Sequence, residues 1–138
     1  MNKKLIWLDD DFLSPALITE QTVLESRGYS ITKAKNPDEF YDKCHADDYA
    51  CIILDISLPL GSKISAGDAK KGMRTGLVVL DEIIKDESLK AIPKVVYTIV
   101  TGADVQLFCD EHDILYINKL DALPWTLADE LDKLLEQS

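Results

Sequence analysis

The sequence has little positive charge, no long apolar run and no paired cysteines, and each shortage argues against a class of protein. Its 138 residues include 15 lysines and arginines against 25 acidic residues, a net charge of −10. Nucleic acids and anionic membrane surfaces attract basic proteins, so we expect neither as a partner. No apolar stretch approaches the roughly 20 residues of a membrane-spanning helix. The stretch behind the initial MNKK runs into acids, unlike a signal peptide.

The cysteines are too few and too irregularly spaced for a disulfide framework or a zinc site. Cys44, Cys51 and Cys109 are odd in number and show no Cys-x-x-Cys spacing. Reduced thiols without a signal peptide predict a cytoplasmic location. The length, with 46% hydrophobic and 29% charged residues, is ordinary for one soluble domain. We therefore expect residues 1–138 to form a single domain.

What the sequence does contain is an alternation of two hydrophobic periods. Short apolar runs predict five strands, at 4–8, 30–34, 49–55, 94–100 and 114–118. Segments with helical spacing follow each of them, at 14–29, 36–47, 75–87, 103–112 and 124–137. Strands that alternate with helices form a parallel sheet covered on both faces. The pattern therefore predicts a doubly wound α/β fold.

Charged residues follow three of the predicted strands. Asp9, Asp10 and Asp11 come after the first strand, Asp55 ends the third, and Lys119 follows the fifth. In such sheets the ligand site lies beyond the carboxyl ends of the strands, where these side chains converge. Adjacent carboxylates repel one another unless a cation joins them, and Mg²⁺ binds one or two carboxylates together with waters and phosphate oxygens. We expect a Mg²⁺ site there.

Four short motifs stand in order at these strand ends. They are the acidic pair Asp9–Asp10, the segment DISLP (residues 55–59), a threonine near the end of the fourth strand, and YINK (residues 116–119). In this combination the chain resembles the receiver domains of two-component response regulators, the CheY-like family, over essentially its whole length. The resemblance implies a five-stranded sheet with the strand order 2-1-3-4-5.

The resemblance also implies a role for each matching residue. Asp55 would be the phosphoacceptor, whose carboxylate attacks a phosphoryl group. Asp10 and Asp55 would bind Mg²⁺ directly, Asp9 through a water, and the Ser57 main-chain carbonyl would add a ligand. Lys119 would pair with Asp55 and then with a phosphoryl oxygen. Asp11 lies outside the motif and reads as a surface acid or helix cap.

The switch hydroxyl has two candidates in the fourth strand. Counting forward from Gly76 without a gap ends the strand on Thr98, which we prefer. In favour of Thr101, a small residue follows it, whereas the large Ile99 follows Thr98. On phosphorylation the hydroxyl would move inward and leave room for Tyr116 to rotate toward the core.

Three features depart from the receiver pattern. Leu120 follows Lys119 where the family usually has proline. Ile99 and Val100 are large and are expected to narrow the approach to the phosphoacceptor. The loop at about 60–75 is longer than usual and reads as a surface insertion, a lid or a partner-docking element. It carries four basic residues, Lys63, Lys70, Lys71 and Arg74.

These motifs predict a phosphoacceptor signalling domain rather than an enzyme with turnover. Its partners would be a histidine kinase or histidine phosphotransfer protein and a downstream protein target, reached through protein contacts because 138 residues leave no room for an output domain. Whether the domain stands alone or is cut from a longer chain stays open.

The sequence leaves three alternative functions. A haloacid-dehalogenase-like phosphatase would need an acid where Ser57 stands. A flavodoxin-like cofactor binder would need a loop rich in hydroxyl groups and glycine after the first strand, where acids stand. A degenerate receiver would bind a partner without being phosphorylated.

Overall fold

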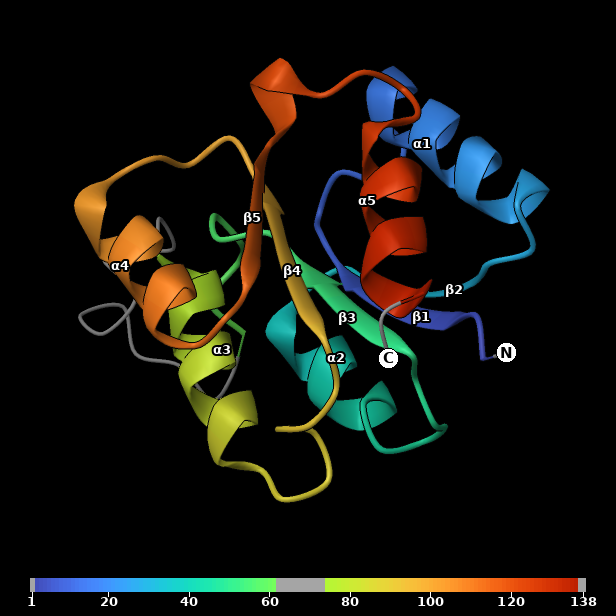
Figure 1. Cartoon of the computed structure of the whole chain (residues 1–138). Coiled ribbons are helices and arrows are strands. Elements are labelled where there is room, and N and C mark those ends of the chain that lie inside the picture. Colours follow the sequence, from blue (N-terminus) through green and yellow to red (C-terminus); the bar gives the residue numbers. More distant parts are fainter. Residues whose placement is uncertain (1, 62–73, 137–138) are drawn as a thin grey trace.

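The structure, a computed structural model, describes residues 2–61 and 74–136. Its centre is a five-stranded parallel sheet with the order β2-β1-β3-β4-β5 (Figure 1), which confirms the predicted fold and strand order. The strands are β1 (Lys4–Leu8), β2 (Ser30–Ala34), β3 (Cys51–Leu54), β4 (Lys94–Thr98) and β5 (Leu115–Asn118).

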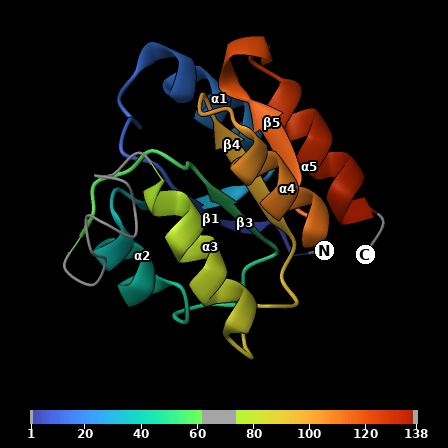
Figure 2. The ribbon, with the colours of Figure 1, turned by 90° about the vertical axis from the view of Figure 1, so that its left-hand side faces the viewer.

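Helices cover both faces of the sheet. They are α1 (Pro15–Ser26), α2 (Pro37–Lys43), α3 (Thr75–Lys85), α4 (Ala103–Glu111) and α5 (Thr126–Glu136), with a short 3-10 helix η1 (Lys119–Asp121) after β5. α1 and α5 lie on one face (Figure 1), and Figure 2 shows α3 and α4 in front of the other face, with α2 beside them. No helix in the described ranges is long and apolar enough to cross a membrane.

Local sequence signals start the first two helices where they were predicted. Ser14 accepts a hydrogen bond from the backbone N–H of Leu17, and Asn36 accepts one from that of Glu39. A proline occupies the first turn of each helix, where no backbone donor is needed. Other ends differ from the prediction: β4 ends at Thr98, two residues early, and α2 ends at Lys43 rather than near 47.

The two faces of the sheet bury different cores. Aliphatic side chains predominate in both cores. The core under α1 and α5 also contains Trp7, Phe12 and Tyr97, and the core under α2, α3 and α4 contains Phe40 and Tyr49. The three cysteines are buried. The single-domain prediction stays a prediction, and most of the long loop predicted at about 60–75, residues 62–73, lies outside the described residues.

A glycine lets α3 start directly against the end of β3. A Cβ atom on Gly76 would lie only 2.1 Å from the main-chain oxygen of Asp55, so no larger residue fits. The backbone N–H of Gly76 donates to the Ile56 carbonyl at 2.8 Å. The buried Thr75 hydroxyl donates to the Leu58 carbonyl at 2.9 Å. These contacts fix the backbone that presents Asp55.

Candidate functional site

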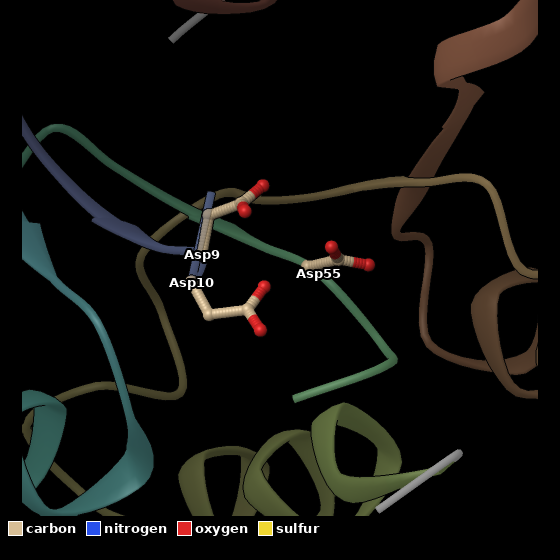
Figure 3. Close-up of side chains that lie close together, drawn as sticks. All are labelled: Asp9, Asp10 and Asp55. Carbon is tan, nitrogen blue, oxygen red and sulfur yellow. The ribbon is translucent and has the colours of Figure 1, made fainter. Parts of the chain in front are cut away.

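Three carboxylates gather at the carboxyl ends of β1 and β3. Asp9 and Asp10 follow β1, Asp55 follows β3, and the two strands are parallel neighbours. One oxygen from each carboxylate lies within 4.8 Å of the others (Figure 3), a group that could hold a metal ion. The sequence argument that strand ends converge at one edge therefore describes these three side chains correctly.

Lys119 joins two of the three carboxylates. Its Nζ donates to Asp9 Oδ2 at 2.7 Å and to Asp55 Oδ2 at 2.9 Å. Asp9 is fully buried and Asp55 nearly so, whereas Asp10 is exposed. The lysine follows β5 at the edge of the sheet and reaches past β4 to both acids. Buried ion pairs need this geometry because each charge must replace its lost hydration.

Burial and charge act against each other in this cluster. Burial raises the pKa of Asp9 to about 6, although Lys119 opposes the rise. Burial acts to lower the pKa of Lys119, but attraction by Asp55 and Asp9 outweighs it and raises that pKa. When all are ionised, three carboxylates and one ammonium leave an excess of two negative charges. A divalent cation would balance that excess.

Thr98 is the hydroxyl that lies at Asp55. It is the last residue of β4, it is fully buried, and its Oγ1 donates to Asp55 Oδ1. The same carboxylate oxygen accepts from the backbone N–H of Ile56 at 2.7 Å. Thr101 is exposed beyond the strand end. Of the two candidates, only Thr98 is placed to act on Asp55.

Tyr116 is linked to this hydroxyl through the loop after β4. The backbone N–H of Val100 donates to Thr98 Oγ1 at 3.1 Å, and Tyr116 Oη donates to the Val100 carbonyl at 2.6 Å. A shift of the Thr98 hydroxyl would therefore break its hydrogen bond with Val100 first, and the movement of Val100 would then change the hydrogen bond of Tyr116. The two residues of the predicted switch pair are connected through the backbone of Val100.

A cavity of about 350 Å³ opens over the acids. It is lined by Asp10, Asp11, Asp55, Ser57, Ile99 and Lys119. Ile99 lines this opening and is 55% exposed, and its effect on the approach to Asp55 stays a prediction. Val100 was also expected to narrow the approach, but it does not line the cavity. It packs instead against the core under α2, α3 and α4. Lys119 and Leu120 are joined without a cis bond, since none occurs among the described residues.

A larger cavity, of about 490 Å³, lies between α2 and α3. Within the described ranges, the acids at β1 and β3 form the one cluster of at least three potential metal ligands. We therefore take the smaller cavity as the candidate site.

Sequence analysis missed the residues beneath the site. Tyr97 Oη donates to Glu20 Oε1 of α1, and both side chains are buried. The apolar spacing from Leu17 to Leu24 places Glu20 on the inward stripe of α1, which was the available signal. A glutamate at such a position indicates a buried partner, but the sequence does not say which one.

Comparisons with solved structures identify the fold. The chain is similar to a CheY-like response regulator receiver domain protein from Methanospirillum hungatei JF-1, with a TM-score of 0.74, 20% identity and coverage of 99% of this chain and 96% of that one. The chemotaxis response regulator CheY4 of Vibrio cholerae gives a TM-score of 0.73 at 18% identity, covering 97% and 99%.

The isolated REC domain of RcsB from Salmonella enterica serovar Typhimurium, solved in the presence of phosphomimetic BeF3-, gives a TM-score of 0.72 at 18% identity, covering 99% of this chain and 90% of that one. No protein-family model matches the sequence, and no curated protein matches it. The likeness to known proteins is therefore one of fold.

Proposed function

We propose that this chain, which has the fold of response regulator receiver domains, is a phosphoacceptor of a two-component or phosphorelay system. The observation that carries the proposal is the pair of side chains on Asp55. Thr98 Oγ1 donates to one carboxylate oxygen of Asp55 and Lys119 Nζ to the other. A carboxylate held in this way beside an open cavity is oriented for attack on a phosphoryl group.

The donor set at the site suits Mg²⁺. All the candidate ligands are oxygens, which this cation requires, and one side of the cluster opens to solvent, so waters and phosphate oxygens have room to bind. Asp10 and Asp55 would hold the ion directly, with the Ser57 main-chain carbonyl. Asp9, already paired with Lys119, would act through a water. When bound, the ion neutralises charge on the phosphoryl oxygens.

The chain's own groups would carry the transfer from a histidine kinase or histidine phosphotransfer protein. A carboxylate oxygen of Asp55 forms a bond to phosphorus while the phosphorus–nitrogen bond to the donor histidine breaks. The leaving imidazole nitrogen keeps the electron pair and takes a proton from solvent. Lys119 and Thr98 turn from the Asp55 oxygens to the phosphoryl oxygens and stabilise their charge.

Phosphorylation would then change a surface. When Thr98 turns to the phosphoryl group, its contact with the Val100 N–H is lost, and Tyr116 is released with the loop. The face formed by α4, β5 and α5 would shift between two arrangements and bind a downstream protein differently. The chain thus acts as a signalling domain, without catalytic turnover and without nucleic acid or membrane. Its odd number of cysteines, all buried, suits a cytoplasmic location.

The test is incubation with acetyl phosphate and Mg²⁺ followed by intact mass measurement. The wild-type chain should gain one phosphoryl group, and the gain should vanish in EDTA and in Asp55→Asn. Labelling that survives Asp55→Asn would overturn the assignment.

The alternatives give other outcomes. A folded chain that gains no mass but binds partners would be a degenerate receiver. Steady hydrolysis of a phosphate ester would indicate a phosphatase.

A further inference from the structure

Lys119 contacts the ring of Tyr97 in addition to the carboxylates of Asp9 and Asp55. Its Nζ lies 5.9 Å from the centre of the Tyr97 ring, inside the roughly 6 Å limit for a cation–π contact. β4 and β5 are paired so that Tyr97 stands opposite Ile117. Ile117 packs on the same face of the sheet as Tyr97, and Lys119 begins η1 directly after β5, close enough for its amine to reach that ring.

The Tyr97 ring is fixed from two sides. Its edge packs against Trp7, with ring centres 6.1 Å apart, and Trp7 in turn packs against Phe12 at 5.4 Å. Its hydroxyl donates to Glu20 Oε1. The whole side chain is only 1% exposed, so the ring has one orientation available to it.

Glu20 is poorly placed for stability. Glu20 is only 6% exposed, and its second carboxylate oxygen, Oε2, has no hydrogen-bond partner among the described residues. A buried carboxyl with one bond destabilises a fold relative to an apolar residue of similar shape. Such a residue is more readily explained by a role in the site than by packing.

We propose that Tyr97 is a positioning residue for Lys119, with its ring holding the ammonium group over the acids and Glu20 fixing the ring. This rests on the proposed phosphoacceptor function. The physical reason is that Lys119 must exchange its contact with an Asp55 oxygen for one with a phosphoryl oxygen during the transfer. Attraction to the ring face does not change in that step, so the flexible lysine stays near the site while it exchanges partners.

The experiment compares Tyr97→Leu with Tyr97→Phe in the full chain. The leucine variant removes the ring, and the phenylalanine variant keeps the ring without the hydroxyl.

The control is Tyr29→Leu. Tyr29 is also buried on the same face, its hydroxyl donates to Asp132 at 2.6 Å, and Lys3 Nζ lies 4.8 Å from its ring centre. This second set of lysine, tyrosine and carboxylate matches the first but takes no part in the proposed site.

Three quantities are measured below the unfolding temperature of each variant: the rate of phosphorylation by acetyl phosphate, the Mg²⁺ dissociation constant, and acetylation of Lys119 by acetic anhydride, read by mass spectrometry. For Tyr97→Leu we expect a phosphorylation rate lower by about fivefold and a more reactive Lys119 amine, with Mg²⁺ affinity unchanged. Tyr97→Phe should lose at most about twofold, because it keeps the ring contact with Lys119 and gives up only the bond through which Glu20 helps to fix the ring. Tyr29→Leu should change neither the rate nor Lys119.

Equal losses in Tyr97→Leu and Tyr97→Phe, or none in either, would overturn the positioning role. So would a rise in acetylation of all lysines alike, since that is the result of general loosening. If the wild type is not phosphorylated, the proposed function fails, and the acetylation of Lys119 still decides whether Tyr97 holds it.

Discussion

The two halves of the candidate site are held in different ways. At the ends of β1 and β3, charged side chains bind one another: Lys119 contacts Asp9 at 2.7 Å and Asp55 at 2.9 Å, mostly out of solvent. In the loop between β4 and α4, residues 99–102, side chains from other elements bind the backbone. Tyr116 bonds the Val100 carbonyl at 2.6 Å, with the loop itself largely exposed.

Arg74, just before α3, completes the hold on that loop. Its Nη2 donates to the Thr101 carbonyl at 3.2 Å, and its Nε donates to Asp104 Oδ2 at 2.9 Å. Gly102 sits between them with φ of 142°, a conformation that favours glycine. A Cβ atom there would lie 3.1 Å from Arg74 Nη2 and 2.8 Å from Asp104 Oδ1.

This difference suggests that the acids and Lys119 carry the reaction, whereas the loop at 99–102 carries the change in shape. Buried charge pairs are costly to break one partner at a time, so the acids and Lys119 keep their geometry. Hydrogen bonds to an exposed backbone contribute about 1 kcal/mol or less each, so the loop can shift when one is lost. Substitutions in the first half should therefore change the reaction strongly, and those in the second should change a balance between arrangements.

The largest expected effect is that of Lys119→Met. Loss of one donor to a developing oxyanion lowers a rate by about 100-fold or more, and phosphorylation by acetyl phosphate should fall accordingly. Mg²⁺ should bind at least as tightly, because a competing positive charge is gone. Lys133→Met removes a lysine whose side chain is 70% exposed and is the control. An unchanged phosphorylation rate would contradict the role given to Lys119.

The next effect concerns the metal. Asp10→Ala should weaken Mg²⁺ binding by more than about tenfold, since even outer-shell partners are worth that much. Asp11→Ala is the matched control, because Asp11 lines the same cavity but lies outside the carboxylate group. A metal titration of both variants gives the comparison. Equal losses would mean that general negative charge, and not a defined ligand, attracts the ion.

Asp9→Asn should reveal what the buried acid costs in the absence of metal. Because burial raises the folded-state pKa of Asp9 from 3.8 to about 6, its stabilising contribution is present below about pH 4 and is lost as pH rises through 6. In EDTA at pH 7.5 the asparagine variant should unfold with a free energy about 1 to 2 kcal/mol higher.

The gain is a net effect, because the attraction of Lys119, which the variant loses, already opposes the rise in the pKa of Asp9. Urea unfolding at pH 7.5 and pH 4 measures it, and at pH 4 the difference should nearly vanish. Asp11→Asn, at an exposed position, is the control for the loss of one negative charge beside the site. A gain that is equal at both pH values would mean that shape, and not charge, distinguishes the asparagine.

The sequence predicted the cluster of acids and Lys119 better than it predicted the loop at 99–102. Acids behind apolar runs reveal strand ends, and parallel strands bring those ends together, so the meeting of Asp9, Asp55 and Lys119 followed from topology. The end of β4 was harder, because an apolar run through 94–100 continues past the true end at Thr98. Apolar period alone cannot separate a strand residue from Val100, which leaves the strand and still packs into the core.

Contacts between distant elements were beyond the sequence. The bond from Tyr97 to Glu20 joins residues 77 positions apart, and that from Arg74 to Asp104 joins residues 30 apart. The apolar stripe of α1 marks Glu20 as inward-facing but does not name Tyr97 as its partner. Nothing in the local pattern distinguishes Asp104 from the other acids of α4. Arg74 was noted only as one of several basic residues in a long loop, and its link to the switch loop comes from the structure.

The smallest expected effect tests that link. Arg74→Gln removes the ion pair with Asp104 and weakens the hydrogen bond to the Thr101 carbonyl. Both contacts hold the loop in the arrangement that it has in the unphosphorylated protein. A partly exposed ion pair is worth under about 1 kcal/mol, so phosphorylation by acetyl phosphate should speed up by about two- to threefold. Backbone amide exchange at residues 99–102 should rise as well, measured by hydrogen exchange on the unphosphorylated chain.

The control for Arg74→Gln is Lys85→Gln in the same part of the fold. Lys85, at the end of α3, also makes an ion pair of 2.9 Å, with Asp81, but that pair is exposed and touches no loop at the site. If the contacts of Arg74 act because they hold the loop at 99–102, the Lys85 variant should leave both the phosphorylation rate and the amide exchange at 99–102 unchanged. A slower rate in Arg74→Gln would mean that the arginine favours the phosphorylated arrangement. Unchanged exchange at 99–102 would mean that Thr98 and Tyr116 hold the loop without it, and the two halves of the site would then differ less than their contacts suggest.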